Sequence, residues 1–243
     1  MRNAANIEIT IPVLNEEKTL RENVEKVIEF FQQECSHLGE ISLVIADNGS
    51  TDKTELIGLG LQDGNECVRY LKVESKGVGL ALKTSWRHSK SDIVGYMDLD
   101  LATDLRHIPQ AISAILVEGY DIVTGSRLLK QSNVLNRGLL RGFISKIFNF
   151  IVRSYFSTKF SDGMCGFKFL RQDIYTKLNE AGAQSNGWFF ATEILIVGEK
   201  LGYKLKDIPV TWIDDPDSKV NIIKLMIEYL KAMRKLKQRI STI

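Results

Sequence analysis

Residues 93–100 read IVGYMDLD, a short apolar run followed at once by two carboxylates. A run of this length that ends in polar residues is typical of a buried strand. Residues two apart in an extended backbone point to the same side, so Asp98 and Asp100 can face one ligand. Paired carboxylates suit Mg²⁺ or Mn²⁺, which bridge diphosphate oxygens. The alternative is a solvated turn at the strand end, which is the commoner explanation of an isolated D-x-D pattern.

The same order, an apolar strand and then a polar cluster, recurs on both sides of this segment. We expect further strands over residues 7–14, 41–46, 68–73 and 122–124, with helices between several of them. This alternation predicts an α/β fold with a mostly parallel sheet covered by helices on both faces. Ligands of such sheets bind at the carboxyl ends of the strands. The position of Asp98 and Asp100 therefore favours a ligand site over a plain turn.

Two other strand ends carry candidate ligand-binding groups. Asp47 is the first residue past the predicted second strand, where it can hold a ribose or a base edge. The residues that follow it, up to Asp52, are also ordinary turn and helix-capping types. Lys76 opens the run KGVG, which can bring backbone close to phosphates or can be a simple glycine turn before a helix.

The second half of the chain is less regular. We expect an amphipathic helix over residues 139–156, a loop and short strand over 162–170, and a helix over 192–201. Residues 203–212 read as a strand, and Pro209 predicts an edge position for it because proline cannot donate to a sheet ladder.

A basic set leads into the helix predicted over residues 139–156 and consists of Arg127, Arg137, Arg141 and, with a hydroxyl, Ser145. The planar guanidinium fork matches phosphate oxygens. The alternative is a solvated helix face on which the aliphatic stems lie along the surface.

Length and composition bound the remaining possibilities. The chain has 243 residues, 44% of them hydrophobic, and a net charge of +2. One domain of this size buries roughly three quarters of its unfolded surface, and the charge gives no case for a nucleic-acid partner. Three cysteines without metal or disulfide spacing indicate a reducing cytosol. No apolar stretch reaches the ~18 uncharged residues of a membrane span, so we expect a soluble chain or one lying on a membrane.

The charge is concentrated at the end of the sequence. Residues 219–243 hold seven Lys or Arg and one acid, interleaved with apolar residues at helical spacing from Ile222 to Ile240. We therefore divide the chain into a domain over residues 1–218 and a basic amphipathic helix over 219–243. Such a helix suits an anionic cytosolic leaflet, and the apolar face of the helix predicted over residues 139–156 is expected to form a second, interfacial contact. It can also dock on the sheet or lead into membrane spans of a longer chain.

Several motifs together resemble a known family. Residues 12–16 (PVLNE), 47–52 (DNGSTD), 97–100 (MDLD) and 125–127 (GSR) occur in the order found in family 2 glycosyltransferases with a GT-A fold. Residues 162–168 (DGMCGFK), the segment 188–195 and the pair Ser218-Lys219 resemble the polyprenyl-phosphate sugar transferases, relatives of dolichyl-phosphate mannose and glucose synthases. The resemblance covers residues 7–220 and implies a single Rossmann-like GT-A domain.

The resemblance also implies roles for individual residues. The donor nucleotide-sugar would be bound by Pro12, Leu14, Asn15, Glu16, Asp47, Lys76, Asp98 and Lys219. Asp98 and Asp100 would hold Mg²⁺ or Mn²⁺ and count as catalytic, together with Asp162 and Glu193 at the sugar pocket. The acceptor phosphate would be bound by Arg127, Arg137, Arg141 and Ser145.

The implied reaction is inverting transfer of a sugar to polyprenyl phosphate on the cytosolic face of a membrane, where the protein would be peripheral or anchored. Mannose synthases carry Gln where this chain has Ala102, and residues 101–103 and 165–168 look more like the glucosyl branch, which favours a UDP-sugar such as UDP-glucose. Alternatives are a GDP-mannose-dependent enzyme, a family 2 transferase acting on a sugar or protein hydroxyl, and a nucleotide-sugar-binding scaffold. A homo-oligomer or a membrane-protein partner stays open.

Overall fold

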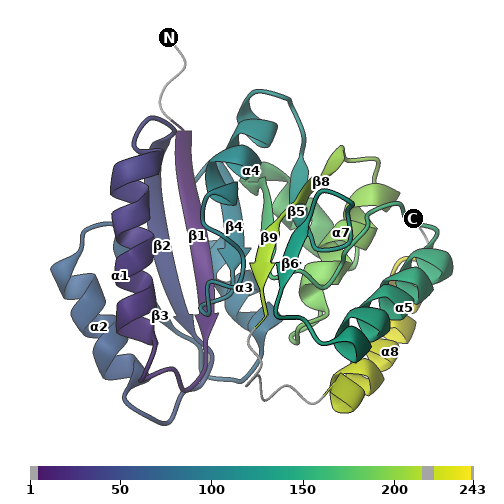
Figure 1. The fold of residues 1–243 in the computed structure, drawn as a ribbon, viewed down its shortest axis with the longest axis horizontal. Helices are drawn as coiled ribbons and strands as arrows, with labels where there is room; N and C mark the ends of the chain where they lie inside the picture. The colour runs from purple at the N-terminus through teal and green to yellow at the C-terminus, as the bar shows by residue number, and fades with distance from the viewer. Residues whose placement is uncertain (1–4, 215–221, 242–243) are drawn as a thin grey trace.

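The computed structural model describes residues 5–214 and 222–241 and confirms the α/β architecture (Figure 1). Its large sheet has seven strands in the order β3-β2-β1-β4-β7-β5-β8. The five strands predicted in the first half are present as β1 (Ala5–Val13), β2 (Gly39–Asp47), β3 (Val68–Lys72), β4 (Ile93–Met97) and β5 (Ile122–Ser126). All pairs among β1 to β4 are parallel, as is the pair of β5 with β8 (Leu205–Pro209), so the sheet is mostly parallel.

One strand of the large sheet runs against its neighbours. β7 (Phe167–Arg171) lies between β4 and β5 and pairs antiparallel with both. Its register places Phe167 opposite Met97, so the residue before β7, Gly166, comes to the end of β4. The segment predicted as a loop and short strand thus forms a central strand that connects the two parallel parts of the sheet.

The strand predicted over residues 203–212 is in fact two strands. β8 is an edge strand of the large sheet and ends at Pro209, as the proline predicted. The chain then leaves that sheet, and β9 (Thr211–Ile213) pairs with β6 (Asn133–Leu135) in a separate two-stranded sheet. β6 has no clear signal of its own because it is only three residues long.

Eight α-helices surround the sheets in the described part of the chain. They are α1 (Leu20–Phe30), which continues into a π-helical turn (Phe31–Cys35), α2 (Thr54–Gly64), α3 (Val78–Arg87), α4 (His107–Leu116), α5 (Leu139–Phe156), α6 (Gln172–Glu180), α7 (Phe190–Lys200) and α8 (Ile222–Arg239). The patterns did not predict α2, α4 or α6. In α4, Pro109 lies in the first turn, where its missing N–H costs nothing.

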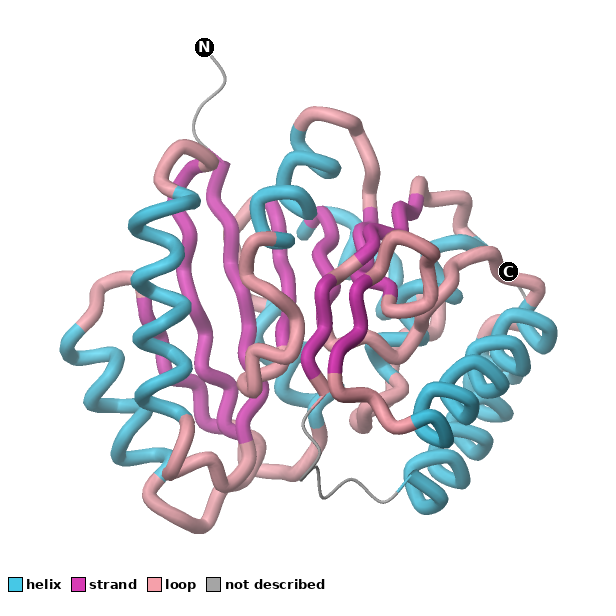
Figure 2. Tube along the Cα trace, viewed as in Figure 1, coloured by secondary structure: helices cyan, strands magenta, loops and turns pink. Residues whose placement is uncertain are grey.

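The core has two main parts, one on each face of the large sheet. α1 and α4 cover one face, where Val24 and Ile112 are fully buried. The other face carries α3, α6 and α7, and the same core cluster extends to side chains of α5 and α8. α5 and α8 lie side by side beyond the end of the sheet (Figures 1 and 2), and the rings of Phe148 and Tyr229 are 5.3 Å apart.

α8 packs on the domain along one side. Tyr229, Met233, Leu236 and Ile240 are buried in the second core cluster, so the apolar stripe of α8 serves the core as far as the end of the helix. The boundary predicted between residues 218 and 219 lies outside the described residues, and that division stays a prediction. Within residues 5–214 and 222–241, none of the helices combines the length and apolarity needed to cross a membrane.

Candidate active site

Polar side chains gather at one edge of the large sheet, where the parallel strands end. Asn15 follows β1, Asp47 closes β2, Asp98 follows β4 and Arg127 follows β5. β1, β2 and β4 are parallel to one another, and β5 runs in the same direction as β4 because both are antiparallel to β7. The carboxyl ends of these four strands therefore meet at the same edge of the sheet.

The most unusual electrostatics in this edge belong to Asp98. The residue as a whole is half-buried, but its Oδ1 atom is buried and has no hydrogen-bond partner among the described residues. Burial raises the pKa of Asp98 to about 7, the negative charge of Asp100 adds to the rise, and Lys168 and Arg127 act against it. A carboxylate in this state gains most from a nearby cation.

The surroundings of Asp98 fit a divalent metal ion. Gly166 leaves the space for the carboxylate, because a Cβ at that position would lie 1.7 Å from Asp98 Oδ2. Asp100 is exposed, and its Oδ1 accepts a hydrogen bond of 3.0 Å from the Ala102 N–H. No group of three or more His, Cys, Asp or Glu that could hold a metal occurs in the described segments. Mg²⁺ is usually held by one or two carboxylates, with substrate phosphates and water as further ligands, which this pair can accommodate.

On the other side of β1, Asp47 is held firmly by the protein. Its Oδ1 accepts hydrogen bonds from the N–H groups of Gly49 (3.1 Å) and Ser50 (2.8 Å), and its Oδ2 accepts one from the Tyr70 hydroxyl (2.7 Å). Asn15 has a left-handed backbone with φ 57°, and its Oδ1 accepts a hydrogen bond of 2.8 Å from the Thr51 N–H. These contacts join the loops after β1 and β2 into one wall. Of the other predicted donor residues, Leu14 and Glu16 lie in the loop after β1, and Pro12 lies near the end of β1 itself.

The start of α3 borders this wall. The Gly77 N–H donates a hydrogen bond of 3.2 Å to Asn48 Oδ1, and Gly77 has a φ of 153°, which a residue with a side chain rarely adopts. The Lys76 side chain beside it is exposed. The run KGVG therefore forms a glycine turn before α3, and this turn leaves the Lys76 side chain free to approach a phosphate as predicted.

Arg127 and Asp162 form a buried ion pair at the end of β5. Arg127 Nε donates to Asp162 Oδ2 (2.7 Å) and Nη2 donates to Oδ1 (3.1 Å). Asp162 Oδ1 also accepts hydrogen bonds from Asn149 Nδ2 (3.2 Å) and from the Met164 N–H (3.1 Å). Burial alone would raise the pKa of Asp162, but the charge and hydrogen bonds of Arg127 lower it to about 2. The Trp212 ring lies 4.7 Å from Arg127 Cζ and covers the guanidinium.

The other members of the predicted acceptor set lie close to this pair. Arg141 Nη1 is 3.3 Å from Asp214 Oδ2. Burial lowers the pKa of Arg137, and the positive charge of Arg127 lowers it further, which places the two arginines within electrostatic range. In the described part of the chain, Arg137 Nε and Ser145 Oγ are buried without a hydrogen-bond partner. Two unsatisfied donors beside clustered guanidinium groups can bind an anion.

Glu193 and Lys219 complete the set of predicted site residues. Glu193 is fully buried in the first turn of α7, where its carboxylate accepts hydrogen bonds from Ser185 and pairs with Arg239. Lys219 lies outside the described residues. The roles assigned to all these residues stay predictions.

Sequence reasoning missed three residues that contact the predicted arginines or Asp162. Trp212 stacks on Arg127, Asp214 pairs with Arg141, and Asn149 binds Asp162. Asn149 had a detectable signal, because the spacing of four that relates Arg141 to Ser145 continues to it along one face of α5. Trp212 and Asp214 come from β9 and the residue after it, and nothing local in the sequence connects them to β5 or α5.

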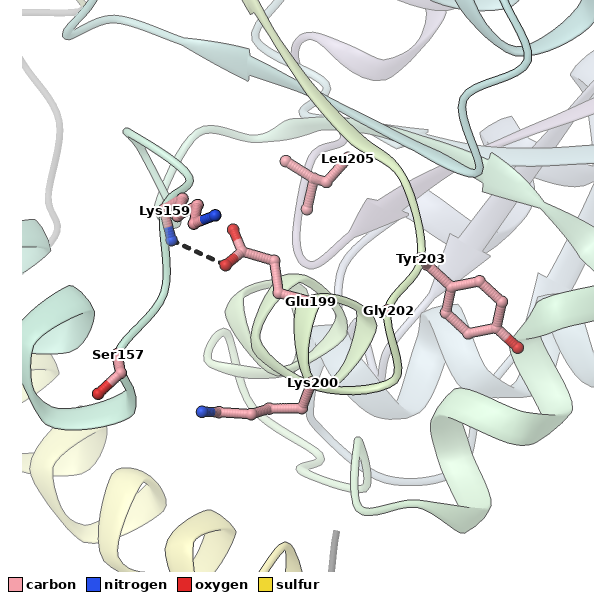
Figure 3. Close-up of a pocket in the computed structure, with 7 residues that line it drawn as sticks. All are labelled: Ser157, Lys159, Glu199, Lys200, Gly202, Tyr203 and Leu205. Carbon is pink, nitrogen blue, oxygen red and sulfur yellow. Dashed lines mark hydrogen bonds between the residues drawn. The ribbon is translucent and has the colours of Figure 1, made fainter.

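Two surface depressions lie elsewhere on the molecule. One, of about 330 Å³, is lined by Glu199 and Lys200 at the end of α7, by Tyr203 in the loop that follows, and by Leu205 at the start of β8, among others (Figure 3). The other, of about 480 Å³, includes Ile93 at the start of β4 and Arg171 at the end of β7. Both depressions lie toward the amino ends of the parallel strands, at the edge of the sheet opposite Asp98 and Arg127. Neither forms part of the candidate site, which we therefore define by the polar residues at the carboxyl edge.

The sheet order, the two helix layers and a carboxylate pair after β4 define an α/β domain of the GT-A class. Residues 8–178 match the family described as Glycosyl transferase family 2, and the chain belongs to that family.

Relatives and solved structures agree with this assignment. Glycosyltransferase AglD of Haloferax volcanii is 28% identical over 224 residues, which cover 91% of this chain and 35% of that protein, so the chain spans about a third of its length. The dolichyl-phosphate beta-glucosyltransferase of Drosophila melanogaster is 25% identical over 225 residues, covering 88% of this chain and 69% of that protein. A crystal structure of glucosyl-3-phosphoglycerate synthase from Mycobacterium tuberculosis with Mn²⁺, UDP and glucosyl-3-phosphoglycerate shares the fold, with a TM-score of 0.69, 19% identity and coverage of 98% and 80%.

Proposed function

We propose that this chain transfers a sugar from a nucleotide-sugar, with UDP-glucose or a related UDP-sugar favoured, to polyprenyl phosphate at the cytosolic face of a membrane. The observation that carries the proposal is a pair of groups left without a hydrogen-bond partner among the described residues: Asp98 Oδ1, and the donors Arg137 Nε and Ser145 Oγ. Asp98 and Arg137 both lie within electrostatic range of Arg127. The Asp98 carboxylate would bind a cation that in turn binds the diphosphate of the donor. The donors Arg137 Nε and Ser145 Oγ would bind the phosphate of the acceptor. Relatives named dolichyl-phosphate beta-glucosyltransferase support transfer of a glucosyl group to a polyprenyl phosphate.

On the donor side, Asp98 and Asp100 would hold a divalent metal ion, which stabilises the departing diphosphate when bound. The wall formed by the loops after β1 and β2 would hold the nucleoside, with Asp47 fixing the shape of the wall through its three hydrogen bonds. The Mycobacterium tuberculosis synthase of similar fold was crystallised with Mn²⁺ and UDP, which is consistent with this arrangement.

On the acceptor side, the chemistry requires orientation more than proton removal. A phosphate monoester has a second pKa of ~6 and is already largely ionised near neutral pH, so it can attack the anomeric carbon without a strong base. Attack from the face opposite the diphosphate inverts that carbon. The state of Asp162 is consistent with a reaction that needs no strong base. Its oxygens already accept hydrogen bonds from Arg127, Asn149 and Met164, and a carboxylate whose pKa is about 2 is a poor proton acceptor. Arg137 and Ser145 would donate to the acceptor phosphate.

The helix that carries Ser145 also offers an apolar surface. On the outer side of α5, Leu140, Phe143 and Phe150 are 71%, 61% and 62% exposed. Exposed apolar residues that gather on one helix mark an interaction surface, and a lipid-linked substrate requires one. α8 adds the exposed Ile227 and Leu230 beside it, together with exposed lysines.

Of the two membrane contacts expected from the sequence, α5 would then provide more apolar surface than the C-terminal helix α8. The apolar stripe of α8 is mostly buried in the core, and its Arg239 points inward to Glu193. We propose that α5 provides the apolar part of the contact and that Lys231 and Lys235 of α8 provide cations for anionic lipid. The acceptor phosphate would then reach Ser145 from the lipid surface while the donor binds from the aqueous side.

One assay distinguishes this function from its alternatives. Purified protein is incubated with labelled UDP-glucose or GDP-mannose and with polyprenyl phosphate, 3-phosphoglycerate or a sugar acceptor without phosphate, each with Mg²⁺ and with EDTA. We expect transfer from UDP-glucose to polyprenyl phosphate that EDTA abolishes. Faster transfer from GDP-mannose would overturn the donor, and transfer to another acceptor would overturn the lipid. Binding of a nucleotide-sugar without transfer would indicate a scaffold.

A further inference from the structure

Glu193 connects the C-terminal helix to a loop of the domain. Its side chain is fully buried, and its Oε2 accepts a hydrogen bond of 2.8 Å from the Ser185 N–H. Its Oε1 accepts hydrogen bonds from the Ser185 hydroxyl and from the guanidinium of Arg239, the last residue of α8. A buried carboxylate with this partner set ties α8 to the loop formed by residues 181–188.

The last turn of α8 also packs directly on that loop. Gly182 has a φ of 132°, and a Cβ there would lie 2.9 Å from Ile240 Cγ2 and 3.4 Å from Arg239 Cβ. Ile240 is buried in this contact. The ion pair is therefore one part of a close contact that requires glycine at position 182.

The same loop holds the first turn of α3 from its other side. Asn186 O accepts a hydrogen bond of 3.1 Å from the Leu80 N–H, and a Cβ on Gly77 would lie 2.3 Å from this oxygen. Lys83 Nζ donates to Gln184 O (2.6 Å) and to Asn186 Oδ1 (2.7 Å). The loop and α3 thus approach each other backbone to backbone, with little room for independent movement.

The first turn of α3 in turn contacts the donor wall. Gly77 donates to Asn48 Oδ1, and Asn48 donates through its Nδ2 to Val13 O at the end of β1 (2.7 Å). Hydrogen bonds and close contacts therefore run without a break from Arg239 to the loops after β1 and β2.

We propose that Arg239 and Glu193 are positioning residues for the donor, so that donor binding depends on α8 being docked. The ion pair fixes the loop 181–188, the loop fixes Gly77, and Gly77 fixes the wall that holds the nucleotide. This inference rests on the proposed function, since it takes that wall as the donor site. It also makes α8, which contributes cations to the proposed membrane contact, a link between lipid and donor.

Two measurements on purified protein without lipid test the inference. The first is acrylamide quenching of tryptophan fluorescence, which reports chiefly on Trp188 in the loop, because Trp188 is 45% exposed while Trp86 and Trp212 are 0% and 7% exposed. The second is the Kd of UDP-glucose with Mg²⁺ by calorimetry. Both are measured for Arg239→Gln, Arg239→Lys and the control Arg234→Gln, which changes an exposed arginine of the same helix.

We expect Arg239→Gln to increase the quenching and to raise the Kd of UDP-glucose about tenfold, the loss typical of a charge-assisted hydrogen bond. Arg239→Lys keeps the charge and should retain most of the affinity, and Arg234→Gln should match the wild type. In steady-state kinetics the change should fall on the KM of the donor and leave the KM of polyprenyl phosphate unaltered.

The Kd is measured well below the unfolding temperature of each variant. A Kd for Arg239→Gln equal to that of the wild type would overturn the inference and leave the ion pair as a stabilising contact. Equal losses for Arg239→Gln and Arg239→Lys would do the same. If Arg239→Gln does not fold, Glu193→Gln decides, because it keeps the shape of the side chain and removes the charge. Wild-type protein that binds no nucleotide-sugar would refute the proposed function itself, which separates the two failures.

Discussion

Replacing Asp162 by Asn should strongly destabilise the protein, because it leaves Arg127 buried without its counterion. The side chains of Arg127 and Asp162 are only 8% and 0% exposed. Removing one partner of a buried ion pair typically costs about 3–5 kcal/mol. The lowering of the pKa of Asp162 from 3.8 to about 2 corresponds to about 2 kcal/mol, at 1.36 kcal/mol per pH unit. The second figure is smaller because it counts only the ionisation of Asp162. It leaves out the free-energy cost of keeping the Arg127 charge buried without a counterion.

Urea unfolding followed by circular dichroism measures the effect. The matched control is Asp173→Asn, which breaks the surface pair with Arg171 and should cost less than about 1 kcal/mol, since the Asp173 side chain is 62% exposed. A double variant that also carries Arg127→Met should recover part of the loss, because an apolar side chain of similar length needs no counterion. A loss for Asp162→Asn no larger than that for Asp173→Asn would refute the reasoning.

The effect also has a defined pH dependence. Because the pKa of Asp162 is lower in the folded protein, its contribution is fully present above the unfolded value of 3.8 and is lost as the pH falls through about 2. The difference in unfolding free energy between wild type and Asp162→Asn should therefore be constant near neutral pH and shrink below pH 4. A difference that grows on acidification would contradict this assignment.

Three other changes test the site and the surface. Asp98→Asn should lower turnover by about two orders of magnitude at saturating Mg²⁺, equivalent to about 2.7 kcal/mol, with an unchanged circular dichroism spectrum; near wild-type turnover would remove Asp98 from the metal site. Gly166→Ala should cause a similar loss because its Cβ would lie 1.7 Å from Asp98 Oδ2, whereas Gly138→Ala, with open space around it, should be neutral. Phe143→Ser with Phe150→Ser should weaken co-sedimentation with anionic vesicles and leave Tm unchanged, since both rings are exposed; unaltered binding would exclude α5 as the lipid contact.

Local sequence patterns predicted those parts of the fold that depend on neighbouring residues. The five strands of the first half and the polar residues that follow them are readable because burial on both faces selects apolar runs and because the ligand edge selects polar ends. The same reasoning placed Asp98 and Asp100 together after β4. α2 and α6 were not predicted because their apolar faces are short and interrupted, by Gly58 and Gly60 in the first case.

The rest depends on contacts between distant segments. The antiparallel insertion of β7 brings Gly166 to Asp98, and β9 brings Trp212 onto Arg127, across intervals that no periodicity spans. The amphipathic pattern of α8 correctly indicated two different faces, but a pattern does not state which face meets the domain. The structure shows that Arg239, a cation on the basic side of the helix, pairs with a buried carboxylate.

The position of β7 has a consequence for how the chain is made. Among the strands of residues 5–214 and 222–241, β5 pairs only with β7 and β8, and both follow it in the sequence. During synthesis, β1 to β4 can assemble as soon as they emerge, whereas the apolar β5 waits for Phe167–Arg171. At 5–20 residues per second this interval lasts roughly two to nine seconds. Throughout it β5 presents unpaired backbone on both edges, the state in which strands associate with the wrong partners, so the nascent chain is most vulnerable to aggregation then and most dependent on chaperones.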